Sequence, residues 1–236
     1  RFSNKLQFKI DKSIKEAIYK KGHLLSNISN ARLFDEFCKI FLNGMAEKNF
    51  NKLSSFGLNK YLILTSPEKN EFTSRLIIEA LRNTDNRLKN NQSVTPGFLM
   101  AAVLWPEILE KSIKKGAINL RKFFRSMDQV LRKQQQITAI PRKFHGYIKD
   151  IWVLQLKLHS RIGKQPYKTL KHPRFRAAYD FLLLREKAAS NKKYLGDWWT
   201  DFQKNDDSIK KSLIKDLREK NNEESSKIFG FSAELR

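Results

Sequence analysis

The chain has 236 residues, enough to bury a full hydrophobic core in one large domain or two small ones. Its 47 Lys and Arg residues against 24 Asp and Glu residues give a formal net charge of +23. One cysteine, Cys38, excludes a disulfide framework, and no apolar run approaches the length of about 18 residues that a membrane span needs. Without a signal-peptide pattern either, we expect a cytoplasmic protein. Because the chain starts with Arg1 rather than Met, we also expect it to be a piece of something longer.

The positive charge is concentrated in the middle of the chain. Residues 111–176 hold 18 Lys and Arg but 2 Asp and Glu, whereas the first 110 residues hold 17 and 11, and residues 206–236 hold 7 and 7. Such a basic belt in a folded chain is typical of a protein that binds a polyanion. An anionic membrane is the competing partner, but helices that lie on membranes need free bulky apolar residues, and here the core needs them. The composition therefore favours nucleic acid.

Apolar residues recur with a period near 3.6 and alternating patterns are almost absent, so we predict an all-α fold. The predicted helices follow in chain order: an element ending near Ile10, a short helix after Asp11, then 31–41, about 46–56, 71–88, 97–105, 108–115, 118–136, 142–162, 173–185 and 193–203. Asp11, Ser29 and Thr95 are the expected N-caps, and Gly44 and Gly57 the expected stops. Pro106 is expected to separate two helices, and the polar, sign-balanced residues from 206 on are expected to form a loose tail.

The predicted helix over 142–162 has two different sides. Its apolar side holds Phe144, Tyr147, Ile148, Ile151, Leu154, Leu158 and Ile162. The opposite arc, of roughly 120°, holds Arg142, Lys143, Lys149, Lys157 and Arg161, with Asp150 as the only acid. Most charged arcs are solvated faces of mixed sign, but a one-signed arc repels itself unless an anion lies on it. This pattern therefore favours an anion-binding face.

The predicted helix from Pro173 to Arg185 is apolar on nearly all sides, which indicates burial between neighbours. Its narrow polar strip runs from Arg176 to Asp180. Arg174 and Arg185 lie in apolar surroundings, so we interpret both as paired structural arginines. The pair Trp198-Trp199 could stack on bases, but helical spacing beside Phe202 favours a place in the core.

The sequence contains no recognisable catalytic pattern. No two acidic residues are separated by one residue, as a shared metal site would favour, and every glycine stands alone, so no phosphate-binding loop is present. The four histidines, His23, His145, His159 and His172, have no metal-ligand spacing. We therefore expect no catalytic residue, metal or cofactor in this chain.

The segment from His172 to Arg185, HPRFRAAYDFLLLR, resembles a signature of bacterial poly(A) polymerases. Further segments of this chain match the family in the same order: RFxxKL at 1–6, ARLFDE at 31–36, NTDNR at 83–87, IPR at 140–142, DIWVLQL at 150–156 and WWTDFQ at 198–203. The similarity covers nearly the whole chain to about Gln203. The CCA-adding enzymes are related, but the central motif and the Trp-Trp segment look like the polyadenylating branch.

This resemblance implies a class II nucleotidyltransferase built as head, neck, body and leg. The head holds the metals, neck arginines read the adenine of ATP, and the body and leg hold RNA. Both ATP and Mg²⁺ would belong to the complete enzyme, since this chain begins just past the base-reading arginines. The implied regions are the neck end at 1–60, a helical body at 61–137, a basic RNA-binding region at 138–205, and the tail at 206–236.

The charge pattern and the resemblance together assign the candidate site residues. The predicted contacts to single-stranded RNA 3′ ends are Arg142, Lys143, Lys149, Lys157, Arg161, Lys164, Lys168 and Lys171. By resemblance, Arg32 and Glu36 brace the junction with the catalytic head domain rather than touch substrate. Family members often end in an Arg/Lys-rich tail, whereas residues 206–236 are neutral, so RNA binding by the tail is not expected.

Two functional hypotheses follow. In the first, the chain is the C-terminal, RNA-holding part of a bacterial poly(A) polymerase, which adds AMP from ATP to RNA 3′ ends. The alternative is a free-standing basic helical module that binds RNA without catalysis. A coding frame upstream of Arg1 that encodes Gly-Ser followed by Asp-x-Asp would favour the first, and a stop codon there would favour the second.

Overall fold

The structure, a computed structural model, describes residues 2–114, 117–189 and 194–223, and regular structure there is almost entirely helical, as predicted. Its α-helices are α1 (Phe2–Lys5), α2 (Lys12–Lys21), α3 (Asn30–Phe41), α4 (Ala46–Ser55), α5 (Glu71–Lys89), α6 (Pro96–Ser112), α7 (Leu120–Gln135), α8 (Arg142–His159), α9 (Gln165–Leu170), α10 (Phe175–Ala188), α11 (Tyr194–Lys204) and α12 (Asp207–Glu223). The 3₁₀ helices are η1 (Gly22–Asn27), η2 (Asn59–Tyr61) and η3 (Pro67–Lys69). Two short antiparallel strands, β1 (Ile113–Lys114) and β2 (Ala117–Ile118), pair Ile113 with Ile118.

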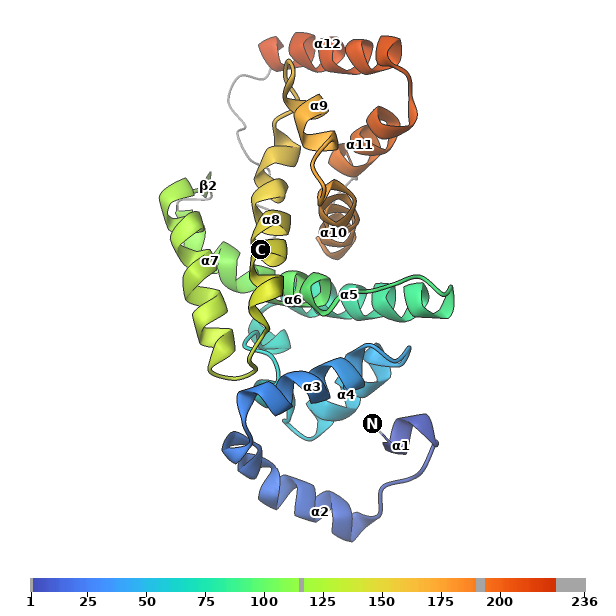
Figure 1. The fold of residues 1–236 in the computed structure, drawn as a ribbon, viewed down its shortest axis with the longest axis vertical. Helices are drawn as coiled ribbons and strands as arrows, with labels where there is room; N and C mark the ends of the chain where they lie inside the picture. Colours follow the sequence, from blue (N-terminus) through green and yellow to red (C-terminus); the bar gives the residue numbers. More distant parts are fainter. Residues whose placement is uncertain (1, 115–116, 190–193, 224–236) are drawn as a thin grey trace.

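The molecule is elongated, with α2 at one end and α12 at the other (Figure 1). Helix α8 runs along the long axis, and α7 and α10 lie on opposite sides of it (Figure 1). The main hydrophobic cluster extends from Leu33 in α3 to Ala188 in α10, and α6 lies at its centre, with every residue from Gly97 to Leu109 buried. Cys38 packs against this cluster, where burial, with Asp35 adding to the effect, raises the pKa of its thiol to about 11.

The predicted N-caps are confirmed. Asp11 Oδ2 accepts a hydrogen bond from the Ser13 amide at 3.3 Å, Ser29 Oγ accepts one from Arg32 at 3.4 Å, and Thr95 Oγ1 accepts one from Phe98 at 3.1 Å. Each cap satisfies an amide that the first helical turn leaves without a backbone partner. The left-handed φ of +67° at Gly57, just past α4, explains why a glycine stands there.

The expected break at Pro106 is wrong, because α6 is one continuous helix from Pro96 to Ser112. A proline inside a helix costs about 3 kcal/mol through its missing donor and its ring. Here Pro106 is itself buried, and α6 packs against α5, α7 and α8. Burial on several sides outweighs the local preference for a break.

The expected loose tail is wrong for residues 207–223, which form α12. Asp206 caps this helix through Oδ1, which accepts hydrogen bonds from the amides of Ser208 at 2.9 Å and Ile209 at 3.1 Å. The apolar side chains of Leu213, Ile214 and Leu217 pack against a second hydrophobic cluster. This cluster consists of Leu154, Leu158, Phe175, Ala178, Tyr179, Leu182, Leu195, Trp198, Trp199 and Phe202. The spacing of Leu213, Ile214 and Leu217 along the chain is helical. This spacing predicts α12, although the polar, sign-balanced composition of the segment favoured a loose tail. Residues 224–236 lie outside the described part of the chain.

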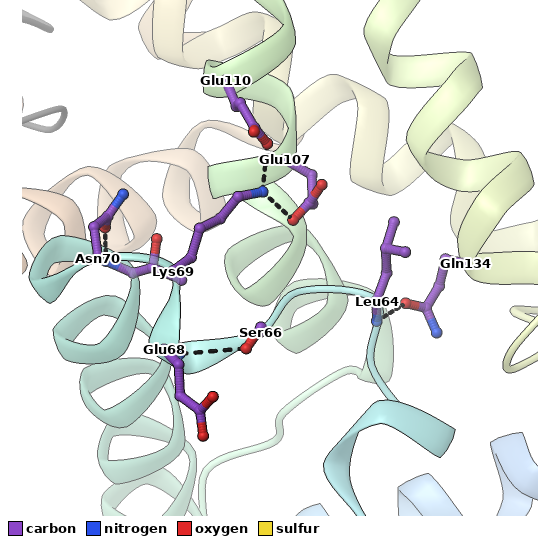
Figure 2. Close-up of polar contacts among 9 residues, drawn as sticks. Leu64, Ser66, Glu68, Lys69, Asn70, Glu107, Glu110 and Gln134 are labelled. Atoms are coloured by element: carbon purple, nitrogen blue, oxygen red, sulfur yellow. Dashed lines mark hydrogen bonds and ion pairs between the residues drawn. The ribbon is translucent and has the colours of Figure 1, made fainter.

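The segment before α5 is tied to α6 and α7 by side chains (Figure 2). Gln134 accepts a hydrogen bond from the Leu64 amide at 2.8 Å, and its own Nε2 donates to the Leu62 carbonyl at 2.9 Å. Lys69 Nζ lies 2.7 Å from Glu107 Oε1 and also pairs with Glu110 (Figure 2). These contacts join the N-terminal helices to the central ones through residues far apart in the sequence.

The second cluster confirms the interpretation of the tryptophans as core. Trp199 is fully buried and donates from Nε1 to the Leu158 carbonyl at 2.9 Å. Trp198 is 8% exposed and stacks on Phe202 at 4.8 Å between ring centroids. Helix α8 contributes to both clusters, with Ile148, Ile151 and Trp152 in the main one and Leu154 and Leu158 in the second.

Candidate nucleic-acid interface

Helix α8 has the predicted buried side, except that Ile162 lies beyond its end and is 53% exposed. Ile148, Ile151, Leu154 and Leu158 are at most 1% exposed, and Trp152 Nε1 donates to the Ala101 carbonyl at 2.9 Å. This hydrogen bond fixes the rotation of α8 about its axis relative to α6. Arg142, Lys143 and Lys157 are exposed to solvent on the other side.

Lys149 departs from the predicted one-signed arc. Its Nζ lies 2.6 Å from Asp128 Oδ1 of α7, with side-chain exposures of 38% and 52%. An acid 21 positions earlier in the sequence thus partly neutralises this position. The pattern of α8 alone could not reveal it, because the partner comes from another helix.

Arg161 is not on the face of α8, which ends at His159, so its predicted position on the wheel is wrong. Gly163, with a φ of +60°, follows in the turn toward α9. The Arg161 guanidinium lies 5.4 Å from the centroid of the Trp198 ring, and burial lowers its pKa although Glu186 opposes this. Arg161 therefore packs on the second cluster.

The other predicted contacts lie around α9. Lys164, Lys168 and Lys171 are exposed, and within the described residues none of them pairs with an acid. The same holds for Arg142, Lys143 and Lys157. Six of the eight predicted contact residues are therefore solvated cations without an intramolecular counter-ion in the part of the chain described here.

The two arginines predicted to be structural behave differently. Arg185 is 2% exposed, donates from Nη1 to Gln155 Oε1 at 2.9 Å, and lies 4.7 Å from the Trp105 ring, as expected of a core arginine. Arg174 is exposed, and its guanidinium lies 4.9 Å over the Tyr147 ring, so its interpretation as a buried paired arginine is wrong. It precedes the first turn of α10, where the chain is not yet enclosed by neighbours.

Arg174 lines a pocket of about 210 Å³ that sequence reasoning did not anticipate. Its lining residues are Arg87, Ser93, Val94, Thr95, Phe98, Tyr147, Pro173, Arg174, Arg176, Ala177 and Asp180. Asp180 Oδ1 lies 3.0 Å from Arg176 Nε, as the predicted polar strip requires, and Asp180 Oδ2 lies 3.4 Å from Arg87 Nη1. Burial raises the pKa of Asp180, against the lowering effect of both arginines. Arg87 belongs to the NTDNR segment and Arg174 to the HPRF segment. That both arginines lie in segments matching the same family was the one indication of this pocket in the sequence.

The segments of the resemblance also have structural roles. Asp85 caps α4, since its carboxylate accepts hydrogen bonds from the amides of Ala46 at 2.6 Å and Glu47 at 3.1 Å. Arg32 is exposed on α3, and Glu36 pairs with Lys39 at 3.0 Å. The bracing role of Arg32 and Glu36 stays a prediction.

Within the described residues no group of three or more His, Cys, Asp or Glu side chains could hold a metal ion, so the residues present do not fit the Mg²⁺ that the resemblance implies for the complete enzyme. None of the helices in this part of the chain combines the length and apolar character needed to cross a membrane.

Comparison with known proteins identifies the class. Residues 7–71 match a family model described as "Probable RNA and SrmB- binding site of polymerase A", and residues 115–228 match one described as "Polymerase A arginine-rich C-terminus". The two models together cover most of the chain. Both descriptions refer to polymerase A, and the chain belongs to the poly(A) polymerase family.

Individual relatives agree with this assignment. Poly(A) polymerase I of Salmonella typhi is 33% identical over 228 residues, which are 92% of this chain and 49% of the relative. The enzymes of that name from Escherichia coli O157:H7 and Haemophilus influenzae are 34% and 33% identical, over 93% and 92% of this chain and 50% of each relative. The chain thus spans about half the length of the curated relatives it matches.

Proposed function

We propose that this chain is the RNA-holding part of a poly(A) polymerase and grips the phosphate backbone of single-stranded RNA. The proposal rests on the exposed Lys and Arg side chains on α8 and around α9 that have no acidic partner among the described residues. They lie in a region that the arginine-rich family model matches. Lys and Arg that neutralise phosphates supply most of the affinity in sequence-independent binding. Solvated cations without intramolecular partners are available for this role.

The complete enzyme, in this proposal, adds AMP from ATP to RNA 3′ ends with Mg²⁺, in the cytoplasm. These steps need a catalytic head domain that holds the metal ions. Several large apolar side chains near the start of the chain are exposed, namely Phe2, Leu6, Phe8, Ile14 and Tyr19. Large apolar side chains left exposed in one part of a chain are typical of a contact surface, and in this proposal they contact that head.

The proposal is tested by titrating a fluorescein-labelled oligoadenylate with the chain and following fluorescence anisotropy over a range of salt concentrations. Contacts to about three to five phosphates give a slope of log K against log salt of roughly −2 to −3.5. A flat salt response, or no binding at low salt, would contradict it. The chain alone should not extend a primer in the presence of ATP and Mg²⁺, since catalysis is assigned to the head.

A further inference from the structure

Four segments that are distant in the sequence form the walls of the pocket at Arg174. The end of α5 contributes Arg87, the residues before α6 contribute Thr95, α8 contributes Tyr147, and the start of α10 contributes Arg174 and Arg176. Three arginines against Asp180 as the acid among the lining residues leave two positive charges in excess. A surplus of this kind, in a pocket with part of its wall apolar, is suited to an anionic group attached to a less polar body.

Arg174 is the cation that remains available. Arg87 and Arg176 both pair with Asp180, whereas Arg174 pairs with no acid among the described residues. Its guanidinium rests on the face of the Tyr147 ring, a contact that leaves the N–H edges of the planar group free to donate. A guanidinium with free edges donates two parallel hydrogen bonds to a phosphate.

The position of Arg174 is fixed from two sides. Its backbone amide donates to His172 Nδ1 at 3.1 Å, which holds the turn before α10. The Tyr147 ring beneath it packs so closely on Gly97 that a Cβ added there would lie 3.0 Å from Tyr147 Cδ1. The first turn of α6 therefore supports the ring, and the ring supports the guanidinium. A donor held in this way loses little side-chain entropy when it binds.

We propose that this pocket binds one phosphodiester of single-stranded RNA, with Arg174 as the donor and Tyr147 as the residue that positions Arg174. The proposal rests on the proposed function and assigns it a defined subsite. A volume of about 210 Å³ is below the range of roughly 300–1,000 Å³ typical of drug-sized ligands, so one phosphate with its neighbouring sugar or base is suitable.

The surroundings favour a polymer over a free nucleotide. Exposed cations lie close to the pocket residues in the sequence: Lys143 is one turn before Tyr147 on α8, and Lys171 is three positions before Arg174. A strand whose phosphate occupies the pocket would meet further positive charge beyond it, whereas a mononucleotide would not use these residues.

The test compares single variants in the anisotropy titration with an oligoadenylate of about 12 nucleotides, a length within the range that single-strand binding sites use. Arg174→Gln should weaken binding about tenfold and make the salt slope about 0.7 less negative, because one phosphate contact is lost. The matched control is Arg121→Gln, which removes one exposed charge from α7, on the opposite side of α8 from α10 (Figure 1). It should change affinity less than about twofold, the expectation for general electrostatics alone.

The positioning role of Tyr147 has its own pair of variants. Tyr147→Phe keeps the ring beneath Arg174 and should bind like the parent, whereas Tyr147→Leu keeps an apolar side chain but should weaken binding several-fold. Thermal melts of all variants verify that each is folded, and a similar Tm for Tyr147→Phe and Tyr147→Leu makes the comparison decisive.

Three outcomes would overturn the inference. Arg174→Gln and Arg121→Gln could weaken RNA binding equally, in which case the pocket has no special role. Tyr147→Leu could bind as tightly as Tyr147→Phe, which removes the positioning role. Arg174→Gln could weaken the binding of millimolar AMP but leave oligoadenylate binding unchanged, in which case the pocket binds a free nucleotide. In all three cases the parent still binds RNA, so they are distinct from a failure of the proposed function, in which the parent itself does not bind.

Discussion

Arg185 and Gln155 form a buried hydrogen bond of 2.9 Å between Nη1 and Oε1, and Gln155 Nε2 in turn donates to the Ala178 carbonyl at 3.0 Å. This chain of contacts joins α8 to α10, and Trp105 of α6 lies under the guanidinium. The contacts that hold the core together thus include a hydrogen bond from an arginine to a neutral amide.

Arg185→Ala should lower the free energy of unfolding by about 3 kcal/mol, because it removes a hydrogen bond from a charged donor, leaves Gln155 Oε1 without it, and opens a cavity beside Trp105. Arg174→Ala is the matched control and should cost within about 0.5 kcal/mol, as exposed substitutions usually do. Urea denaturation of both variants measures this, and equal losses would contradict the assignment of one arginine to the core and the other to the surface.

His159 should make the protein less stable in mild acid. Burial, with Arg185 and Arg161 adding to it, lowers the pKa of His159 from 6.5 to about 3. The unfolded chain therefore binds a proton below pH 6.5 that the folded chain does not bind until about pH 3, so stability falls as the pH drops through this window, by up to ~1.4 kcal/mol per pH unit. In His159→Leu this contribution should vanish, and His23→Gln, at an exposed histidine, is the control. Identical pH profiles for His159→Leu and the parent would refute the assignment.

Two glycines in helices should respond oppositely to alanine. A Cβ at Gly196 would overlap Glu186 Oε2 and lie 2.6 Å from Leu183 Cδ2, and Glu186 caps α11 through the amides of Leu195 and Gly196. Gly196→Ala should therefore destabilise by about 1–3 kcal/mol. Gly146, in α8, has no atom within 4 Å of an added Cβ, so Gly146→Ala should stabilise by up to about 1 kcal/mol. Thermal melts of the two variants decide this, and a lower Tm for Gly146→Ala would be the contrary result.

The lysines around α9 should contribute charge rather than shape to RNA binding. Replacing Lys164, Lys168 and Lys171 by Gln should make the salt slope less negative by about 2, since each neutralised phosphate contributes about 0.7. The same three positions changed to Arg keep the charge and should keep the slope. Anisotropy titrations at several salt concentrations measure both, and an unchanged slope in the Gln variant would remove these residues from the interface.

Asp128 should limit the part that Lys149 has in binding. Asp128→Asn removes the acid 2.6 Å from Lys149 Nζ and should tighten RNA binding, with a salt slope more negative by about 0.7. Stability should change by no more than ~1 kcal/mol, because the pair is partly exposed. In the parent background Lys149→Gln should weaken binding less than Lys157→Gln. The reverse order would show that the ion pair does not restrain Lys149.

The sequence by itself determined what depends on neighbours along the chain. Caps such as Ser29 and Thr95 act within three residues, and the spacing of Trp198 and Phe202 already places them on one helix face. The burial of Arg185 followed from its apolar flanks in the same helix. Such features are local, so the all-α class, most helices and much of the core could be predicted.

The tertiary structure decided whatever depends on partners from other segments. Asp128 neutralises Lys149 from 21 positions away, and Arg87 meets Asp180 across 93 positions. Because α6 packs against three helices, it continues as one helix past Pro106. The turn after His159 places the Arg161 guanidinium against the Trp198 ring. The periodicity of a sequence does not predict which helix surfaces contact each other, because these contacts depend on the summed burial of all the helices. For this reason the pocket at Arg174 could be found only in the tertiary structure.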